Sequence, residues 1–244
     1  MNDHLAPIPT LTAGYDLAGR ELPRAPRSSR GGEPLRVRRI QPGEPLGDVQ
    51  RLRREVYFEE QGKNDKQHSR RISDGLDASG TVVVVEEGRQ AVATLRLHDF
   101  GSPAVQVEYG SLFQIDRFAR TWPLERVAVC TRFAVQAERR AKAVVDALVE
   151  ETYRHAHEHG IQFGLIACPS FLHGVFEHYG FREYLPPAVL PSGLALLRMG
   201  LVVDAAVLLR ECESPLLSLV RNPVAGNAAQ GWLTRTFPEK SSAL

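Results

Sequence analysis

The chain has 244 residues, and its 30 basic and 29 acidic side chains leave a formal net charge of +1 at pH 7. This balance excludes the basic excess that is typical of nucleic-acid-binding proteins. The first residues show no signal-peptide pattern, and no apolar run is long enough to span a bilayer, so we expect a cytoplasmic protein without an integral membrane segment.

Three segments are expected along the chain. Residues 1–34 are rich in Pro, Gly, Ser and Arg, which is typical of a flexible leader. Residues 35–204 contain the periodic segments and are expected to form one domain. Residues 205–244 form a C-terminal tail with one apolar stretch. The cysteines are widely spaced, and Cys130 and Cys168 lie in apolar runs, so we expect them to be buried and reduced.

The first periodic elements are a strand, a helix and a hairpin. Residues 35–40 alternate apolar and basic side chains, as in a half-buried strand. A helix is expected from about Asp48, which suits its N-cap. The buried face of this helix is expected to consist of Val49, Leu52, Val56 and Tyr57. Two β-branched runs, 81–85 and 91–97, flank the charged turn EEGR and predict an antiparallel hairpin. A short helix is expected at residues 111–118.

The second half of the chain is organised around a strand, a basic turn and a long helix. Residues 127–135 predict a buried strand, and the turn QAERRAK leads into a helix whose apolar residues recur every 3.6 positions until Gly160. A strand at 161–167, a helix that ends at Gly180 and a strand at 194–203 follow.

The resulting order, β-α-(α)-β-β-(α)-β-α-β-α-β-β, predicts an α/β protein with a mixed central sheet and helices on both faces. The turn before the long helix contains Arg139, Arg140 and Lys142. Exposed N–H groups and the helix dipole make such a turn suitable for phosphate. A solvated charge cluster is the alternative interpretation.

With the helix-ending sequence HYGF at 178–181, this order resembles the GNAT acyltransferase superfamily. Within it, four segments are similar to the branch that contains acyl-homoserine-lactone synthases and long-chain N-acyl amino acid synthases. These segments are RREVYFEEQG at 53–62, DGLD at 74–77, ATLRL at 93–97 and VCTRFAV at 129–135. The chain departs from the branch at Val129, where a glutamate is usual, and lacks its tryptophan after the first segment. Phe176 replaces the tyrosine of many acetyltransferases.

The resemblance implies transfer of an acyl group, with a long chain favoured, from an acyl carrier protein thioester or acyl-CoA to the amine of an amino acid, small amine or peptide. It implies no permanently bound cofactor. The glycine-poor turn leaves less room to wrap a pyrophosphate, which favours the carrier protein. Backbone N–H groups near Phe133 and Val135 are expected to polarise the thioester carbonyl. Arg139, Arg140 and Lys142 are expected to bind the phosphopantetheine phosphate or an acidic carrier.

Charged side chains in the resembled segments are candidates for a pocket that binds the acceptor amine. They are Arg54, Asp74, Asp77 and Arg96, with an arginine for a carboxylate and an aspartate for the amine. Turn capping is the alternative role of the two aspartates. Arg132 lies in the middle of an apolar strand and therefore needs a partner, for which Asp74, Asp77 and Glu108 are candidates. Two roles of Arg132 stay possible: an ion pair that links a loop to the sheet, and a direct contact with the substrate.

The candidate catalytic residues are Arg132, Glu108 and Glu125. Glu59 and Glu60 are further carboxylates near the resembled segments, and a water relayed by backbone carbonyls is an alternative proton acceptor.

Three histidines end the long helix, and His155 and His159 are an i, i+4 pair that can bind metal. No third ligand is evident nearby in the sequence, so we expect a solvated helix end and no metal. Other functions stay open: a short-chain acyl-CoA acetyltransferase, a non-catalytic protein that binds an acyl group or a partner, and, less favoured, an acyl-homoserine-lactone synthase.

Overall fold

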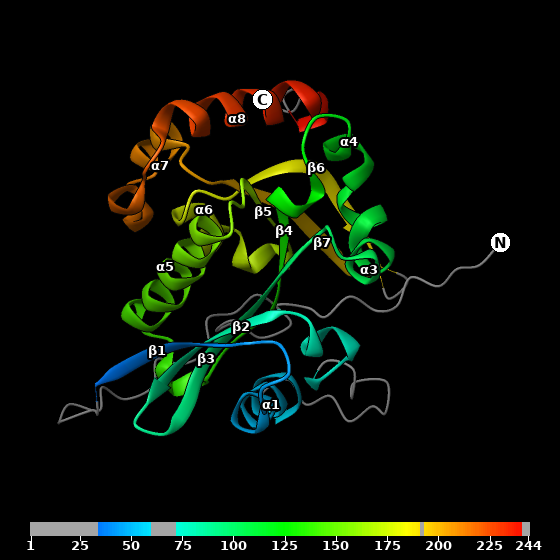
Figure 1. The fold of residues 1–244 in the computed structure, drawn as a ribbon. Coiled ribbons are helices and arrows are strands. Elements are labelled where there is room, and N and C mark those ends of the chain that lie inside the picture. The colour runs from blue at the N-terminus through cyan, green and yellow to red at the C-terminus, as the bar shows by residue number, and fades with distance from the viewer. Residues whose placement is uncertain (1–33, 60–71, 191–192, 241–244) are drawn as a thin grey trace. The chain divides into compact units, whose positions relative to one another are not determined.

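A computed structural model describes residues 34–59, 72–190 and 193–240 (Figure 1). The strands are β1 Leu35–Ile40, β2 Thr81–Glu87, β3 Gln90–Asp99, β4 Val127–Val135, β5 Phe163–Pro169, β6 Arg182–Val189 and β7 Ala195–Val202. The principal helices are α1 Gly47–Arg54, α3 Pro103–Phe113, α4 Ile115–Ala119, α5 Lys142–Glu158, α6 His173–His178, α7 Ala206–Glu211 and α8 Pro223–Thr236. The expected leader at 1–34 lies, except for Pro34, outside the described residues.

The strands are hydrogen-bonded in the order β1-β2-β3-β4-β5-β7-β6. β4 and β5 are parallel, whereas β1–β2, β2–β3, β5–β7 and β6–β7 are antiparallel, so the mixed sheet that the sequence predicted is confirmed. The chain divides into two compact units. Unit 2 contains the described residues 34–59, 72–97 and 131–152, and unit 1 contains 98–130, 153–190 and 193–240.

Unit 2 is built on β1, the β2–β3 hairpin, the end of β4 and helix α1 (Figure 1). The apolar face predicted for the first helix is confirmed, because Val49, Leu52, Val56 and Tyr57 are all buried. These side chains form one core cluster with β-strand residues, namely Ile40, Val82, Val84, Ala91 and Ala134. The expected N-cap is wrong: α1 begins at Gly47, and Asp48 lies in its first turn, where its carboxylate accepts a hydrogen bond from Arg51 at 2.6 Å.

Unit 1 contains β5, β6 and β7 with an aromatic core. Phe118 of α4 contacts the rings of Phe163, Tyr184, Trp232 and Phe237, with centroid distances of 5.2–5.9 Å. Trp232 and Phe237 come from the C-terminal tail, so this segment supplies core side chains. The burial of Phe237, which is 2% exposed, shows that the tail is packed up to that residue.

Helix α8 is held close to the turn after β7 by a glycine. A Cβ on Gly226 would come within 2.0 Å of the backbone carbonyl of Asp204. Asp204, at φ 65°, accepts hydrogen bonds from the backbone N–H groups of Arg221 and Asn222, each at 2.9 Å. The carboxylate of Asp204 therefore anchors the start of α8.

The helix expected at 111–118 is wrong in its extent. α3 begins earlier, at Pro103, and Gln114 in a left-handed conformation at φ 49° separates it from α4. Proline is well tolerated in the first helical turn because its missing N–H has no partner there in any case. The expected strand 194–203 and the helix end at Gly160 are confirmed within a residue or two.

No helix within the described ranges is both long and apolar enough to cross a bilayer. Cys130, Cys168 and Cys212 are free thiols, and the first two are buried as expected. Burial raises the pKa of each buried thiol to about 12, aided at Cys168 by the charge of Glu183. Neither thiol is therefore a reactive thiolate at neutral pH.

Candidate active site

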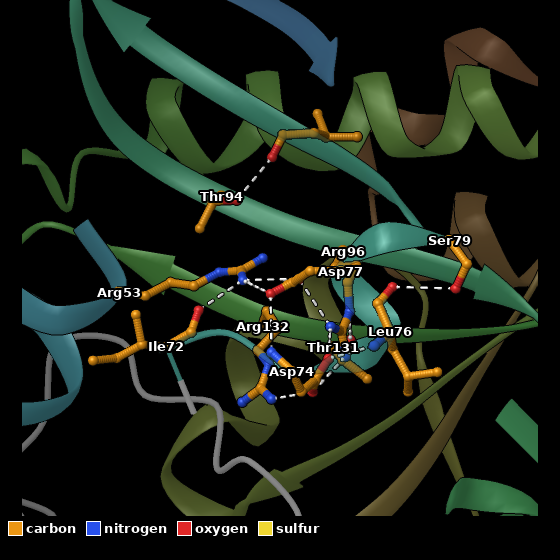
Figure 2. Close-up of polar contacts among 11 residues, drawn as sticks. Arg53, Ile72, Asp74, Leu76, Asp77, Ser79, Thr94, Arg96, Thr131 and Arg132 are labelled. Atoms are coloured by element: carbon orange, nitrogen blue, oxygen red, sulfur yellow. Dashed lines mark hydrogen bonds and ion pairs between the residues drawn. The ribbon is translucent and has the colours of Figure 1, made fainter. Parts of the chain in front are cut away.

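A buried network of three arginines and two aspartates lies in unit 2 (Figure 2). Arg53 Nη1 donates to both carboxylate oxygens of Asp77 at 2.9 Å, and Arg96 Nη1 donates to Asp77 Oδ1 at 2.9 Å and Asp74 Oδ1 at 2.5 Å. Arg132 Nη2 donates to Asp74 Oδ2. The expectation that Arg132 is paired is confirmed, and Asp74 is a partner.

The elements of unit 2 explain why these groups converge. Arg96 lies opposite Val82 in the β2–β3 register, so its side chain shares the sheet face on which Val82 packs with α1. Arg53 lies on the buried side of α1, one turn after Val49. Asp74 and Asp77 are the first and last members of a capping box that begins the 3₁₀ turn Gly75–Ala78. The capping role and the ion-pair role of these aspartates therefore coexist.

A backbone irregularity brings Arg132 to the network. Consecutive residues of a regular strand point to opposite faces. Thr131 Oγ1 nevertheless accepts a hydrogen bond from Arg96 Nε at 3.0 Å, and Arg132 reaches Asp74 in the same network. Arg132 has φ 58°, a left-handed conformation that breaks the alternation of β4. Such a conformation costs about 1–2 kcal/mol for a residue with a Cβ, and this cost is offset by the ion pair.

The charges of the network shift the carboxyl pKa values downward. Burial alone would raise the pKa of Asp74, but the hydrogen bond and charge of Arg96, followed by Arg132, outweigh burial and lower it to about 2. The pKa of Asp77 is also lowered against the effect of burial, chiefly by Arg53 and then Arg96. Both aspartates are thus ionised at neutral pH. Among the described residues, the network joins three guanidinium groups to two ionised carboxylates.

The predicted acceptor-binding residues divide into two groups. Asp74, Asp77 and Arg96 lie together in the network, whereas Arg54 is exposed. The neighbouring Arg53, which is fully buried, occupies the network and also donates to the carbonyl of Ile72 at 3.0 Å. The helical period predicts that Arg53 is buried, because a residue four positions after Val49 lies on the same face of the helix.

The predicted catalytic residues are also separated between the units. Arg132 belongs to unit 2, but Glu108, half-buried on α3, and Glu125, exposed just before β4, belong to unit 1. A proton acceptor among these two carboxylates stays a prediction.

Strand β4, which precedes the basic turn, pairs with β5 over only part of its length. β4 has nine residues, but its ladder with β5 covers only three pairs, from Val127 with Phe163 to Val129 with Leu165. Phe133 and Val135 lie beyond that ladder with fully buried side chains. The carbonyl of Phe133 accepts a hydrogen bond from the hydroxyl of Tyr57 at 3.0 Å, which fixes the orientation of this part of β4.

Two cations of the basic turn form ion pairs with carboxylates of the same chain. A 3₁₀ turn at Ala137–Arg139 leads into α5, whose first residue is Lys142. Arg139 Nε lies 2.6 Å from Glu87 Oε2, and Lys142 Nζ lies 2.8 Å from Asp146 Oδ2. Lys142 is largely exposed, and an exposed pair contributes at most about 1 kcal/mol, so an anion can compete with Asp146 for it; Arg139 is half-buried. Arg140 is half-buried.

Comparison with known protein families gives one match. The family model described as N-acyl amino acid synthase FeeM matches residues 48–193, which include all five charged residues of the network. No curated protein sequence matches the chain.

Solved structures show the same fold at low identity. The structure of FeeM, an N-acyl amino acid synthase from uncultured soil microbes, has a TM-score of 0.55 and 15% identity, covering 76% of this chain and 97% of that one. The acyl-homoserine-lactone synthase LasI gives a TM-score of 0.53 at 18% identity, with coverages of 74% and 96%. The CoA-dependent acyl-homoserine-lactone synthase BjaI, solved with SAM and isopentyl-CoA, gives 0.56 at 18%, with coverages of 75% and 91%.

Proposed function

The chain belongs to the N-acyl amino acid synthase FeeM family and is an N-acyltransferase, and from that premise we propose that it transfers a long fatty acyl chain from an acyl carrier protein to the amine of an amino acid. In this reaction the amine nitrogen attacks the thioester carbonyl, the C–N bond forms, the C–S bond breaks, and the carrier leaves as a free thiol after the amine loses a proton.

The arginines of the network support an acceptor that carries a carboxylate. Arginine binds carboxylates in a bidentate manner, and Arg96 and Arg132 already bind the carboxylate of Asp74. Asp74 is the carboxylate of the network that solvent reaches, with one fifth of its side chain exposed. We therefore place the carboxylate of the acceptor near Arg132 and Arg96, and its amine near Asp74.

The edge of β4 beyond Val129 is the proposed position of the thioester. Backbone N–H groups there can polarise the carbonyl of the acyl group without any side chain. The basic turn that follows in the sequence is the proposed position of the phosphopantetheine phosphate, bound by Arg139, Arg140 and Lys142. For the proton of the attacking amine we propose Glu108 or Glu125, which can be compared through their glutamine variants.

The test measures release of carrier thiol from acyl carrier thioesters of several chain lengths, with mass spectrometry of the products. Each amino acid is compared with its decarboxylated amine. We expect N-acyl amino acids and at least a tenfold lower kcat/KM for the amine that lacks a carboxylate. No thiol release with any donor refutes the proposal, and equal use of both acceptors refutes the role of the network.

Variants distinguish a role in transfer from a role in folding. Arg132→Ala is expected to lower kcat/KM by at least about 100-fold, the scale of losing one transition-state contact. Arg51→Ala is the matched control, because Arg51 is exposed on α1, where it pairs with the exposed Asp48. Circular dichroism must show that both variants are folded.

Acyl-CoA is the second candidate donor. The similarity in fold to BjaI, a CoA-dependent acyl-homoserine-lactone synthase, supports this alternative. Comparing kcat/KM for an acyl-CoA and an acyl carrier protein thioester of the same chain length decides between the two donors. The carrier is supported if Arg139→Ala with Lys142→Ala raises the KM for the carrier donor and CoA is used poorly; efficient transfer from CoA contradicts it.

A further inference from the structure

Three potential metal ligands meet where α5 ends (Figure 1): His155, Glu158 and His159. One ligand atom from each lies within 4.8 Å of the others. The residues are spaced i, i+3 and i+4, which places them on the same side of one helical turn. His155 is buried, whereas Glu158 and His159 are exposed. The sequence interpretation overlooked Glu158, which is three residues from His155.

The hydrogen bond of His159 determines which of its nitrogens can bind a cation. Its Nδ1 lies 2.9 Å from the backbone carbonyl oxygen of His155. A carbonyl oxygen only accepts, so Nδ1 donates to it, and Nε2 is the nitrogen left to bind a cation. An N–H bond to a backbone carbonyl is the usual way in which a metal-binding histidine is oriented.

The two imidazole rings lie close enough to bind one cation together. Their centroids are 3.9 Å apart, with an angle of 36° between the rings. Two histidines spaced i, i+4 on one face of a helix are an arrangement that binds zinc.

The backbone around the cluster is fixed by a glycine turn. Gly160 has φ 66°, and the N–H groups of Gly160 and Ile161 donate to the carbonyls of His157 and Ala156 at 3.2 and 2.9 Å. This turn stops the helix directly after His159. The C-terminal end of a helix carries partial negative charge and favours a cation. His157 points elsewhere, since its Nε2 lies 3.2 Å from Asp204.

We propose that His155, Glu158 and His159 bind one divalent transition-metal ion of the zinc class, with water as a fourth ligand. Two imidazoles and one carboxylate form a donor set that suits zinc, with bonds of about 2.0–2.2 Å and ligand atoms about 3.4 Å apart in a tetrahedron. The ligand atoms already lie within 4.8 Å of one another, and a small adjustment of the exposed Glu158 side chain would shorten this separation while His159 keeps its bond to the carbonyl of His155. The site is independent of acyl transfer, and none of its residues has a role in the proposed reaction.

The test uses the full chain without an affinity tag and with Zn²⁺ alone as the probe. Competition with a chromogenic chelator measures affinity, and metal analysis after dialysis measures stoichiometry. We expect one Zn²⁺ per chain and at least a tenfold weaker affinity in His159→Ala. Co²⁺ in place of Zn²⁺ should give the visible absorption of a four-coordinate site, and this absorption should be lost in the same variant.

His173→Ala is the matched control. The His173 ring lies 3.7 Å from Glu177 and 3.5 Å from Glu183, so it is another histidine beside carboxylates in unit 1. It should keep the affinity of the unmodified chain within twofold. Melting curves without metal check that each variant is folded, and Glu158→Gln carries the test if His159→Ala does not fold. Unchanged affinity in the folded ligand variant, or no bound Zn²⁺ in the unmodified chain, overturns the proposal.

Discussion

Replacement of Asp74 by asparagine tests the charge network most directly. Asparagine preserves the shape of the side chain but removes the charge that faces Arg96 and Arg132. Burial opposes ionisation of Asp74, yet Arg96 and then Arg132 lower its pKa from 3.8 to about 2. A shift of this size corresponds to about 2 kcal/mol of stability at neutral pH. The arginines left without this partner add to the loss, so we expect the free energy of unfolding to fall by about 2–4 kcal/mol at pH 7.

The same shift determines the pH range of the effect. The pKa of Asp74 is lower in the folded chain than in the unfolded chain, so its contribution is complete above about pH 5. It is lost as the pH falls through about 4 and then through the folded value of about 2. Urea denaturation at several pH values should therefore show the unmodified chain and Asp74→Asn converging in stability as the pH falls.

The matched control is Asp116→Asn. Asp116 is exposed and lies 3.8 Å from Arg120, so its replacement should change stability by less than about 0.5 kcal/mol. A loss in Asp74→Asn as small as that of the control would refute the reasoning. So would a difference between Asp74→Asn and the unmodified chain that stays constant from pH 7 to pH 3.

Two further substitutions test the packing of each unit. Tyr57→Phe removes the buried hydrogen bond to the carbonyl of Phe133 and should lower the free energy of unfolding in urea by about 1–2 kcal/mol; an unchanged midpoint would contradict this. Gly226→Ala places a methyl group 2.0 Å from the backbone of Asp204 and should cost about 3 kcal/mol or more in thermal melting. Gly174→Ala, where nothing lies within 4 Å, should be neutral or stabilising by up to about 1 kcal/mol, and equal effects of the two alanines would contradict the packing argument.

Periodicity predicted most of the sheet and the long helix because those elements bury one continuous face. β4 runs from Val127 to Val135, as its apolar run predicted, and α5 ends before Gly160. Strand β6, at Arg182–Val189, was not located from the sequence. It contains Pro186 and Pro187, which cannot donate to a ladder, and this is tolerated because β6 is an edge strand with register shifts at the prolines.

The site was predicted in part, and the missing part depends on backbone geometry and spatial proximity. Arg96 and Arg132 could be chosen because charged residues in apolar strands need partners, whereas Asp74 and Asp77 were chosen because their segment resembles one of the acyltransferase branch. The choice of Arg54 over Arg53 was wrong because it overlooked the phase of α1, which the apolar residues Val49, Leu52 and Val56 indicate. The left-handed conformation of Arg132 has no sequence signature, since an arginine there gains its stability from Asp74, far away in the chain.

The division of the chain into two units has a consequence for its synthesis on the ribosome. All described residues of unit 2 precede residue 153, whereas unit 1 requires β7 and α8, which are made last. Domains generally fold as units while the chain emerges. The Arg–Asp network can therefore form while the partners of the Phe118 cluster, Trp232 and Phe237, are still untranslated. A chain whose synthesis stops before these residues would contain every residue of the charge network but lack two rings of the aromatic core.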